Sequence, residues 1–369
     1  MSAHRRRRRR PVVLGVVITV LAMGSVAALA GVRMLGNRYE SAVNRADLLP
    51  SHERSDTGKP EPPKVRGPLN LLLIGSDSRT NRKPASKDNP ADGPQDGRSD
   101  VIMLVHIPKS TDRAYVVSIP RDTYMPIATS DGAHGARNKI NAAFAWGGAP
   151  RLIQTLNAFI GDTIDYPIII DFAGIRNLTD LVGGVDVVVD KTSTDTYRYL
   201  PSNTPYPTAP CKDPSGEARR CIVFKAGKVH LDGKLAEYYV RQRRGLPNDD
   251  LDRAKRHQQY LSALTAKLAG GDLLTNPINF DRVVRSAASV LTVDTSMPVQ
   301  RLAFTLRNLR ADDLTFMTLP IAENRNVPGV GAVMVPNEAQ CRELFAALRN
   351  EQMDRYLRDH PPNDVSHGR

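Results

Sequence analysis

The sequence predicts a layered α/β/α domain with a central mixed sheet, preceded by one N-terminal transmembrane helix. Short apolar runs bounded by turn residues alternate with longer segments of helical spacing, a pattern typical of α/β domains. An uncharged stretch near the N-terminus is long enough to cross a bilayer. The chain has 369 residues, of which 41% are hydrophobic, so it can bury a core of full domain size.

Short apolar runs between turn residues predict strands at 69–74, 101–107, 114–119, 167–170, 185–190 and 314–319. The second and third runs are separated by PKSTDR, which predicts a hairpin. Helical spacing predicts helices at 151–160, 172–182, 232–240, 249–268, about 277–290 and 297–309, and one more opened by Pro336 and Asn337. Residues 191–228, rich in Thr, Pro, Ser and charge, are expected to form an insertion. The Gly/Pro-rich stretch from 320 to 335 is expected to be irregular.

Most of the excess positive charge lies at the N-terminus. Of the net charge of +12, residues 1–66 carry 13 Lys/Arg against 5 Asp/Glu, or +8, and the remainder carries 38 against 34, or +4. Six arginines in the segment 1–10 precede an uncharged stretch of 22 residues, which we assign to a transmembrane segment at 11–33. The arginines are expected to stay cytoplasmic and the rest of the chain to be extracellular, which makes this a single-pass protein of the cell membrane.

A cleaved signal peptide is the alternative for this segment. The tripeptide at 28–30, Ala-Leu-Ala, has the small-residue form that a signal peptidase accepts. The length favours an uncleaved signal-anchor, because the apolar part of a signal peptide is usually about 7 to 15 residues long. The anchor also accounts for the basic run, so no nucleic-acid partner is expected.

The remaining boundaries follow from composition. Residues 34–68 are polar and end in GKPEPPKVRGP, which predicts a semi-rigid linker above the membrane. The folded domain is therefore expected at 69–350. Residues 351–369 are charged and are expected to form a flexible tail.

Three cysteines fit an extracellular location with one disulfide and one remaining thiol. Cys211 and Cys221 flank the polar segment KDPSGEARR, which has no hydrophobic period to hold it, and they are predicted to pair. Zinc is a poor alternative, because the chain has neither a CxxC motif nor a nearby His pair.

Pairs of arginine and aspartate lie at the ends of three predicted strands: Asp77 with Arg79, Arg98 with Asp100, and Arg121 with Asp122. Ligands of α/β domains bind at strand ends of this kind. A guanidinium group offers paired donors to phosphate, and two carboxylates suit a hard cation such as Mg²⁺. A single pair of this kind would usually be a solvated surface ion pair, but three at strand ends favour a site.

A second basic cluster lies downstream, at the end of one predicted helix and the start of the next. It includes the run RQRR at 241–244 and the segment RAKRH, in which Arg253, Arg256 and His257 share one helical face. Together the two groups describe a metal-bridged pyrophosphate site.

These motifs closely resemble those of the LytR/CpsA/Psr family of cell-wall glycopolymer phosphotransferases. The resemblance covers roughly residues 69–268 and is carried by LLLIGSDSR, RSDVIMLVHI, VVSIPRDTYMPI, KINAAFAWGG, FAGIRNLTDLVGGVDVVVD, LDGKLAEYYVRQRR and DDLDRAKRHQQ. It implies transfer of a phosphoglycan from a polyprenyl pyrophosphate carrier to the 6-hydroxyl of muramic acid in peptidoglycan, outside the membrane and with Mg²⁺ or Mn²⁺.

The resemblance also implies roles for individual residues. Asp77 and Asp100 match the metal ligands. The expected pyrophosphate contacts are Arg79, Arg98, Arg121, Lys139, Arg241, Arg243, Arg253 and His257. The expected catalytic residues are Arg121, Asp122 and Arg98, with Asp122 able to orient Arg121.

Several alternatives stay open. The family's RxxRQ motif ends in glutamine, and here either His257 or Gln258 fills that position. The general base is not identified, and Asp100 and Asp122 are candidates. The same site could serve a polyprenyl pyrophosphate hydrolase, with water as the acceptor. A non-catalytic wall-polymer-binding or regulatory protein is disfavoured, because Asp77 and Asp100 would repel a polyanion unless a metal intervened.

Overall fold

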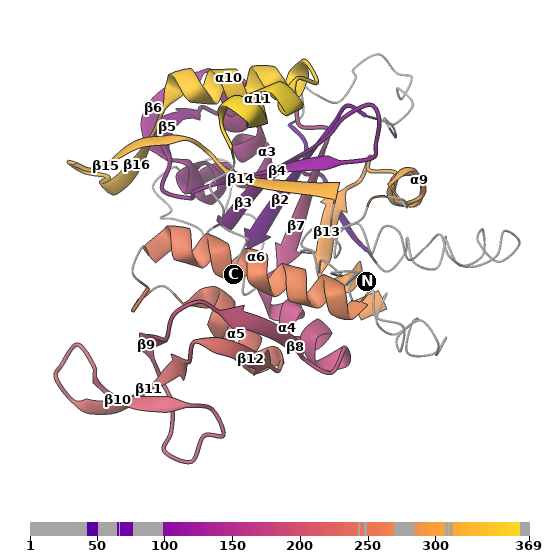
Figure 1. The fold of residues 1–369 in the computed structure, drawn as a ribbon. Helices are drawn as coiled ribbons and strands as arrows, with labels where there is room; N and C mark the ends of the chain where they lie inside the picture. Colours follow the sequence, from indigo (N-terminus) through magenta and orange to yellow (C-terminus); the bar gives the residue numbers. More distant parts are fainter. Residues whose placement is uncertain are drawn as a thin grey trace, which may run out of the picture.

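The computed structural model describes residues 43–50, 65, 67–76, 99–242, 244–246, 249–268, 285–286, 288–306, 309 and 313–361. Seven strands within these ranges form a central sheet in the order β1–β13–β7–β2–β3–β4–β14 (Figure 1). Their bounds are β1 Asn44–Ala46, β2 Leu69–Ser76, β3 Ser99–Ile107, β4 Ala114–Ile119, β7 Tyr166–Asp171, β13 Leu291–Asp294 and β14 Leu314–Thr318. β3 is antiparallel to β2 and β4, whereas β2 pairs in parallel with β7 and β4 with β14. The predicted mixed sheet and its β3–β4 hairpin are confirmed.

Helices cover both faces of this sheet. One face packs on α3 (Ile140–Ile160), α10 (Glu338–Arg349) and α11 (Met353–Asp359), and the other on α4 (Phe172–Leu181), α5 (Gly233–Arg241), α6 (Asp249–Leu268) and α9 (Val299–Thr305). Side chains alternate along each strand, so Leu72 and Ile74 of β2 join the first layer while Leu71 and Leu73 join the second. The predicted α/β/α layering is therefore present.

α3 begins eleven residues before the helix that the sequence predicted at 151–160. The difference lies at Gly147 and Gly148, which leave helical geometry and kink the element; Gly148 has a φ of +64°, which glycine adopts without steric cost. Residues 140–146 are also helical, but the two glycines interrupt the helical pattern of the sequence between them and the predicted helix. Its early start places Lys139 at the N-terminus of the helix.

Two hairpins outside the central sheet were not predicted. β5 (Tyr124–Ala128) pairs with β6 (His134–Lys139), and β15 (Ile321–Val327) pairs with β16 (Gly331–Pro336). The expectation of irregular structure at 320–335 was wrong. β15 reads IAENRNV, in which five successive residues are exposed, so it lacks the apolar alternation by which strands are recognised.

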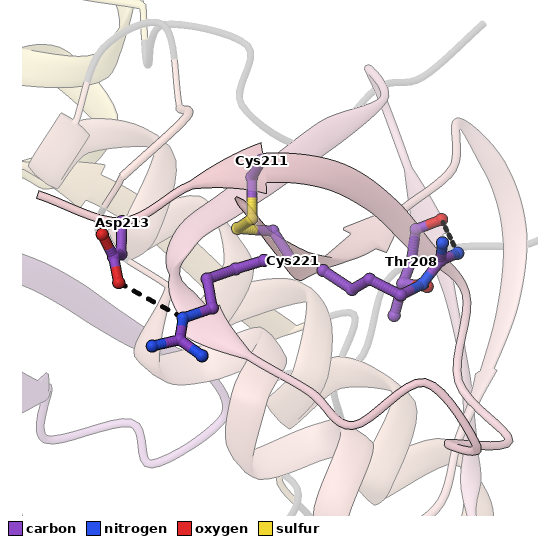
Figure 2. The surroundings of a disulfide bond; sticks show 6 residues. Thr208, Cys211, Asp213 and Cys221 are labelled. Atoms are coloured by element: carbon purple, nitrogen blue, oxygen red, sulfur yellow. Dashed lines mark hydrogen bonds and ion pairs between the residues drawn. A yellow bond between two sulfur atoms is a disulfide. The ribbon is translucent and has the colours of Figure 1, made fainter. Parts of the chain in front are cut away.

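The insertion at 191–228 is also made of strands. β9 (Ser193–Tyr199), β10 (Thr208–Lys212) and β11 (Ala218–Phe224) form one small sheet, and β8 (Val185–Val189) pairs with β12 (Gly227–Leu231). Cys211 and Cys221 are joined by a disulfide across β10 and β11 (Figure 2). Polar contacts flank this bond, from Arg219 to Asp213 at 3.2 Å and from Arg220 to Thr208 at 2.8 Å. Cys341 is a buried free thiol that donates to the Pro320 carbonyl at 3.5 Å.

Both predicted boundaries of the folded domain differ from the structure. β1 lies inside the predicted linker, yet it pairs in parallel with β13, and Val43 and Leu48 are buried in the core. The predicted tail contains α11, whose Met353 is 1% exposed. Short elements that are held mainly by contacts with distant parts of the chain are not visible in local composition.

Asp294 fastens the N-terminal segment to the sheet. Its carboxylate accepts hydrogen bonds from the backbone amides of Leu48 (2.8 Å) and Leu49 (3.0 Å) and from Ser296. Burial opposes the charged form, but these hydrogen bonds outweigh it and hold the pKa of Asp294 below its usual 3.8.

We predict that Asp294→Ala lowers the free energy of unfolding by about 3 kcal/mol at pH 7, because buried amides lose their acceptor. Since the folded-state pKa is depressed, this stabilisation is complete above about pH 4 and is lost as the pH falls through the folded pKa. Urea unfolding of both proteins at pH 7 and pH 3 checks this. A difference that does not shrink at the lower pH would contradict it.

Within the residues that the structure describes, no helix is both long and apolar enough to cross a membrane. The predicted segment 11–33 lies outside them, as does most of the helix expected at about 277–290.

Candidate functional site

The strand directions bring the predicted site residues to one edge of the sheet. β2, β4 and β7 run in the same direction, because β3 is antiparallel to both β2 and β4. Their C-terminal ends therefore share an edge, and β3 begins there, with Ser99 opposite Ser76. β2 ends at Ser76, and Arg121 lies two residues beyond the end of β4, so residues far apart in sequence reach the same edge, as expected for an α/β ligand site.

The backbone is irregular where β3 begins. Gly75 is opposite Val101 and Ser76 is opposite Ser99, so Asp100 is the additional residue of a β-bulge. Bulges often lie next to active sites, where they redirect a side chain. Asp100 thus lies at the end of the β2–β3 pair where β2 ends.

A compact turn follows β4 and carries Arg121 and Asp122. The turn is closed by Thr123, whose backbone amide and hydroxyl both donate to the Pro120 carbonyl, at 3.0 and 2.6 Å. The first two amides of α3 donate to carbonyls of this turn. Ile140 donates to Thr123 at 2.8 Å, and Asn141 donates to Arg121 at 3.1 Å. These bonds satisfy helix amides that would otherwise lack an acceptor, and they fix the turn against the helix.

Asp122 lies between two cations. Its Oδ2 is 3.4 Å from Nε of Arg121, and its Oδ1 is 3.0 Å from Nζ of Lys139. The three side chains are 14%, 15% and 23% exposed, in the order Arg121, Asp122, Lys139. Limited water access strengthens these interactions and holds both cations in place. Motifs 18 residues apart in the sequence thereby form one charged cluster.

Arg241 reaches the same edge through antiparallel packing of α4 and α5. Gly233, at the start of α5, donates to Asp180 near the end of α4, while Glu237 contacts Arg176 in the first half of α4. Glu237 also binds Arg241 at 2.7 Å. The end of α5 therefore lies near the start of α4, which directly follows β7. Figure 1 shows α6 below the sheet, in the same layer as α4 and α5.

The basic face of α6 is buried against α5 rather than exposed. His257 donates through Nε2 to the Val240 carbonyl at 2.7 Å, and Arg253 is 4% exposed. Arg256 lies over the rings of Tyr239 (4.3 Å) and Phe224 (5.0 Å). Burial lowers the pKa of Arg256, and the neighbouring Tyr239 opposes this shift.

Arg256 also donates to the side chains of Gln242 and Ser193. It therefore joins α5, α6 and β9. The i, i+3, i+4 spacing identified the shared face of α6, but not that this face packs on aromatic rings.

We predict that Arg256→Lys lowers the free energy of unfolding by about 2 kcal/mol, because lysine cannot make two planar hydrogen bonds while stacked on Tyr239. Arg219→Lys is the matched control, since Arg219 is exposed and its replacement should change stability by less than about 0.5 kcal/mol. Chemical denaturation of both variants measures the difference. Equal stability of the two variants would show that Arg256 is no anchor.

Several predicted residues lie outside the described part of the chain: Asp77, Arg79, Arg98 and Arg243, together with the side chains of Asp100 and Gln258. Among the residues that are described, no group of three or more His, Cys, Asp or Glu could hold a metal ion. The Mg²⁺ ligands and the occupant of the family's glutamine position stay predictions.

Comparison with known proteins agrees with this architecture. The LytR_cpsA_psr family model matches residues 32–350. The chain is 30% identical over 338 residues to the probable cell wall biosynthesis protein LcpB of Corynebacterium glutamicum, covering 91% of this chain and 71% of LcpB. It is 28% identical over 274 residues to TagU of Bacillus mycoides, named as a polyisoprenyl-teichoic acid–peptidoglycan teichoic acid transferase, covering 71% of this chain and 74% of TagU.

A solved structure shares the fold. TagT bound to LIIa-WTA superposes with a TM-score of 0.54 and 22% identity, covering 83% of this chain and 99% of TagT. At this identity the likeness concerns the fold alone.

Proposed function

Because this chain belongs to the LytR/CpsA/Psr family, we propose that it transfers a phosphoglycan from a polyprenyl pyrophosphate carrier to peptidoglycan in cell-wall assembly. The name of its relative TagU describes a transfer of this kind, from a polyisoprenyl-linked teichoic acid to peptidoglycan. TagT, which shares the fold, has been solved bound to LIIa-WTA.

The observation that carries the proposal is the cluster of Arg121, Asp122 and Lys139 at the C-terminal edge of the sheet. Two cations held by one carboxylate, on a turn fixed between a strand and a helix, form a preorganised site for the doubly charged pyrophosphate. Arg241, fixed by Glu237, lies at the same edge and adds a further cation.

In the proposed reaction, a hydroxyl oxygen of the acceptor attacks the sugar-side phosphorus of the pyrophosphate. A new P–O bond forms, the bridging P–O bond breaks, and the polyprenyl phosphate departs with the electron pair. The hydroxyl proton passes to a carboxylate, for which Asp100 and Asp122 are the candidates. The contacts of Asp122 support an orienting role for it, since both its oxygens face cations. The proposed acceptor is the 6-hydroxyl of muramic acid.

Mg²⁺ is proposed as the cofactor, with Mn²⁺ as its substitute. The family motifs assign Asp77 and Asp100 as its ligands, and two carboxylates suit a hard cation. Asp100 is the additional residue of the β-bulge at this edge of the sheet. Asp122 does not fit that role, because it is engaged by Arg121 and Lys139. A bound Mg²⁺ would neutralise charge that develops on the phosphate oxygens.

The proposed location is the cell membrane. Segment 11–33 would anchor the chain there and hold the catalytic domain on the outer side, where a membrane-bound carrier lipid and peptidoglycan both lie within reach.

A transfer assay with the purified full-length chain tests the function. The reactants are a polyprenyl pyrophosphate donor with a labelled glycan, insoluble peptidoglycan and Mg²⁺. Transfer predicts that label becomes bound to peptidoglycan in a one-to-one ratio with released polyprenyl phosphate. Release at the same rate without peptidoglycan would identify a hydrolase, and retention of intact donor would identify a binding protein.

A further inference from the structure

Two β-hairpins leave the catalytic turn side by side. β5 begins at Tyr124, and the returning strand β6 ends at Lys139, opposite Tyr124 in register. The β15–β16 hairpin is attached at the same turn, because Met334 donates to the Asp122 carbonyl at 2.9 Å and forms a β-bridge with Thr123. Figure 1 shows β15 and β16 reaching outward next to β5 and β6.

Exposed arginines from both hairpins meet at one aromatic ring. The guanidinium carbon of Arg137 (β6) is 5.3 Å from the centre of the Tyr124 ring, and that of Arg325 (β15) is 5.8 Å from it. The two arginine side chains are 39% and 50% exposed. Interaction with a ring orients a guanidinium while leaving its N–H edge able to bind phosphate or carboxylate. Tyr124 therefore holds two anion-binding groups beside each other.

The acidic neighbours of these two arginines do not prevent them from binding an anionic ligand. Glu338 is 3.4 Å from Arg137, and Glu323 is 3.5 Å from Arg325, and both glutamates are 56% exposed. Ion pairs between side chains as exposed as these are weak and are screened by salt, so an anionic ligand can replace the glutamates.

We infer that Arg137, Tyr124 and Arg325 form a binding track for anionic repeats of the glycan being transferred. The inference rests on the proposed function, which places the pyrophosphate at Lys139 and Arg121. Arg137 lies two residues along β6 from Lys139, a distance of about 7 Å in a strand. A chain that carries phosphate or carboxylate in each repeat meets the arginines as it leaves the pyrophosphate. The track thereby selects charged polymers over neutral ones.

The test compares two donors on the same polyprenyl pyrophosphate carrier, one bearing a short poly(glycerol phosphate) chain and one bearing a neutral disaccharide. In the full-length chain, the double variant Arg137→Ala/Arg325→Ala should raise KM for the anionic donor about tenfold or more, the scale of losing charged hydrogen bonds. kcat for that donor and both constants for the neutral donor should stay within about twofold of wild type. Arg113→Ala is the control, because Arg113 is similarly exposed (44%) but lies at the opposite end of β4.

Binding of free poly(glycerol phosphate) supplies a readout that needs no turnover. The double variant should bind it about tenfold more weakly at low salt, and the difference should vanish near 1 M salt, where the Debye length is about 3 Å. Equal binding and equal KM for wild type and the double variant would overturn the track. An equal rise in KM for both donors in the double variant would also overturn it. So would a rise in KM for peptidoglycan with no change in KM for either donor. A wild type that binds the polymer through these arginines but transfers neither donor would instead refute the proposed function.

Discussion

Replacing Arg121 with lysine is expected to lower turnover roughly 100-fold, the scale of one preorganised donor to a developing oxyanion. Arg121 is 14% exposed, follows a buried strand, and forms an ion pair with Asp122, whose Oδ2 is 3.4 Å from its Nε. Lysine keeps the charge but offers it as a point, whereas arginine presents planar paired donors to two oxygens. If those oxygens gain charge in the transition state, kcat falls while substrate affinity changes much less. Release of polyprenyl phosphate with a muramic acid acceptor present measures this effect.

The control for this variant is Arg113→Lys, at the far end of β4, where an exposed arginine contacts Asp112 and Asp354. Thermal unfolding shows whether Arg121→Lys is folded. A drop of only a few-fold in the folded protein would mean that Arg121 merely pairs with Asp122, as an ion pair of little consequence for catalysis. Near-normal turnover would remove Arg121 from the catalytic residues.

Asp77→Ala and Asp100→Ala are each expected to lower Mg²⁺-stimulated turnover about 1,000-fold, because metal stabilisation of transition-state charge contributes several kcal/mol. Both carboxylates are proposed ligands, so removing either one leaves too few ligands to offset dehydration of the cation. Titration of turnover with Mg²⁺ and with Mn²⁺ measures the effect in each variant.

Asp112→Ala is the matched control, since Asp112 is 56% exposed and lies in the β3–β4 turn, away from the site. Chelation of the metal should reduce wild type and this control to the level of the two variants. Persistence of Mg²⁺-stimulated turnover near the wild-type rate in Asp77→Ala or Asp100→Ala would exclude that aspartate as a ligand.

Local sequence pattern was sufficient for the elements that bury many apolar side chains. The runs at 69–74, 101–107 and 114–119 became β2, β3 and β4, because a strand covered on both faces must be apolar throughout. The helix predicted at 249–268 has those bounds in the structure, since its apolar residues recur at helical intervals. The short polar segment between Cys211 and Cys221 was enough to predict their disulfide, which the structure confirms.

Placement of the site residues at strand ends was also a property of the sequence, because the ends of parallel strands meet at one edge whatever the loops do. The sequence alone thus determined the α/β class, the strands that position the site, and the residues to test. It could not reveal which cations share a carboxylate. Asp122 joins Lys139 to Arg121 only because the β5–β6 hairpin returns the chain to the turn after β4.

Tertiary structure decided three further features. β1 and α11 are ordered by burial against distant segments, and their own sequences read as linker and tail. Arg256 is an internal anchor because aromatic rings of α5 and β11 and the hydroxyl of Ser193 surround it, whereas its position in the sequence suggested only a basic face. The arginines around Tyr124 come from hairpins almost 200 residues apart, which no helical or strand period relates. The hydrophobic periodicity of a sequence indicates which face of a helix or strand is buried. Which groups the polar side chains of that element contact depends on long-range packing.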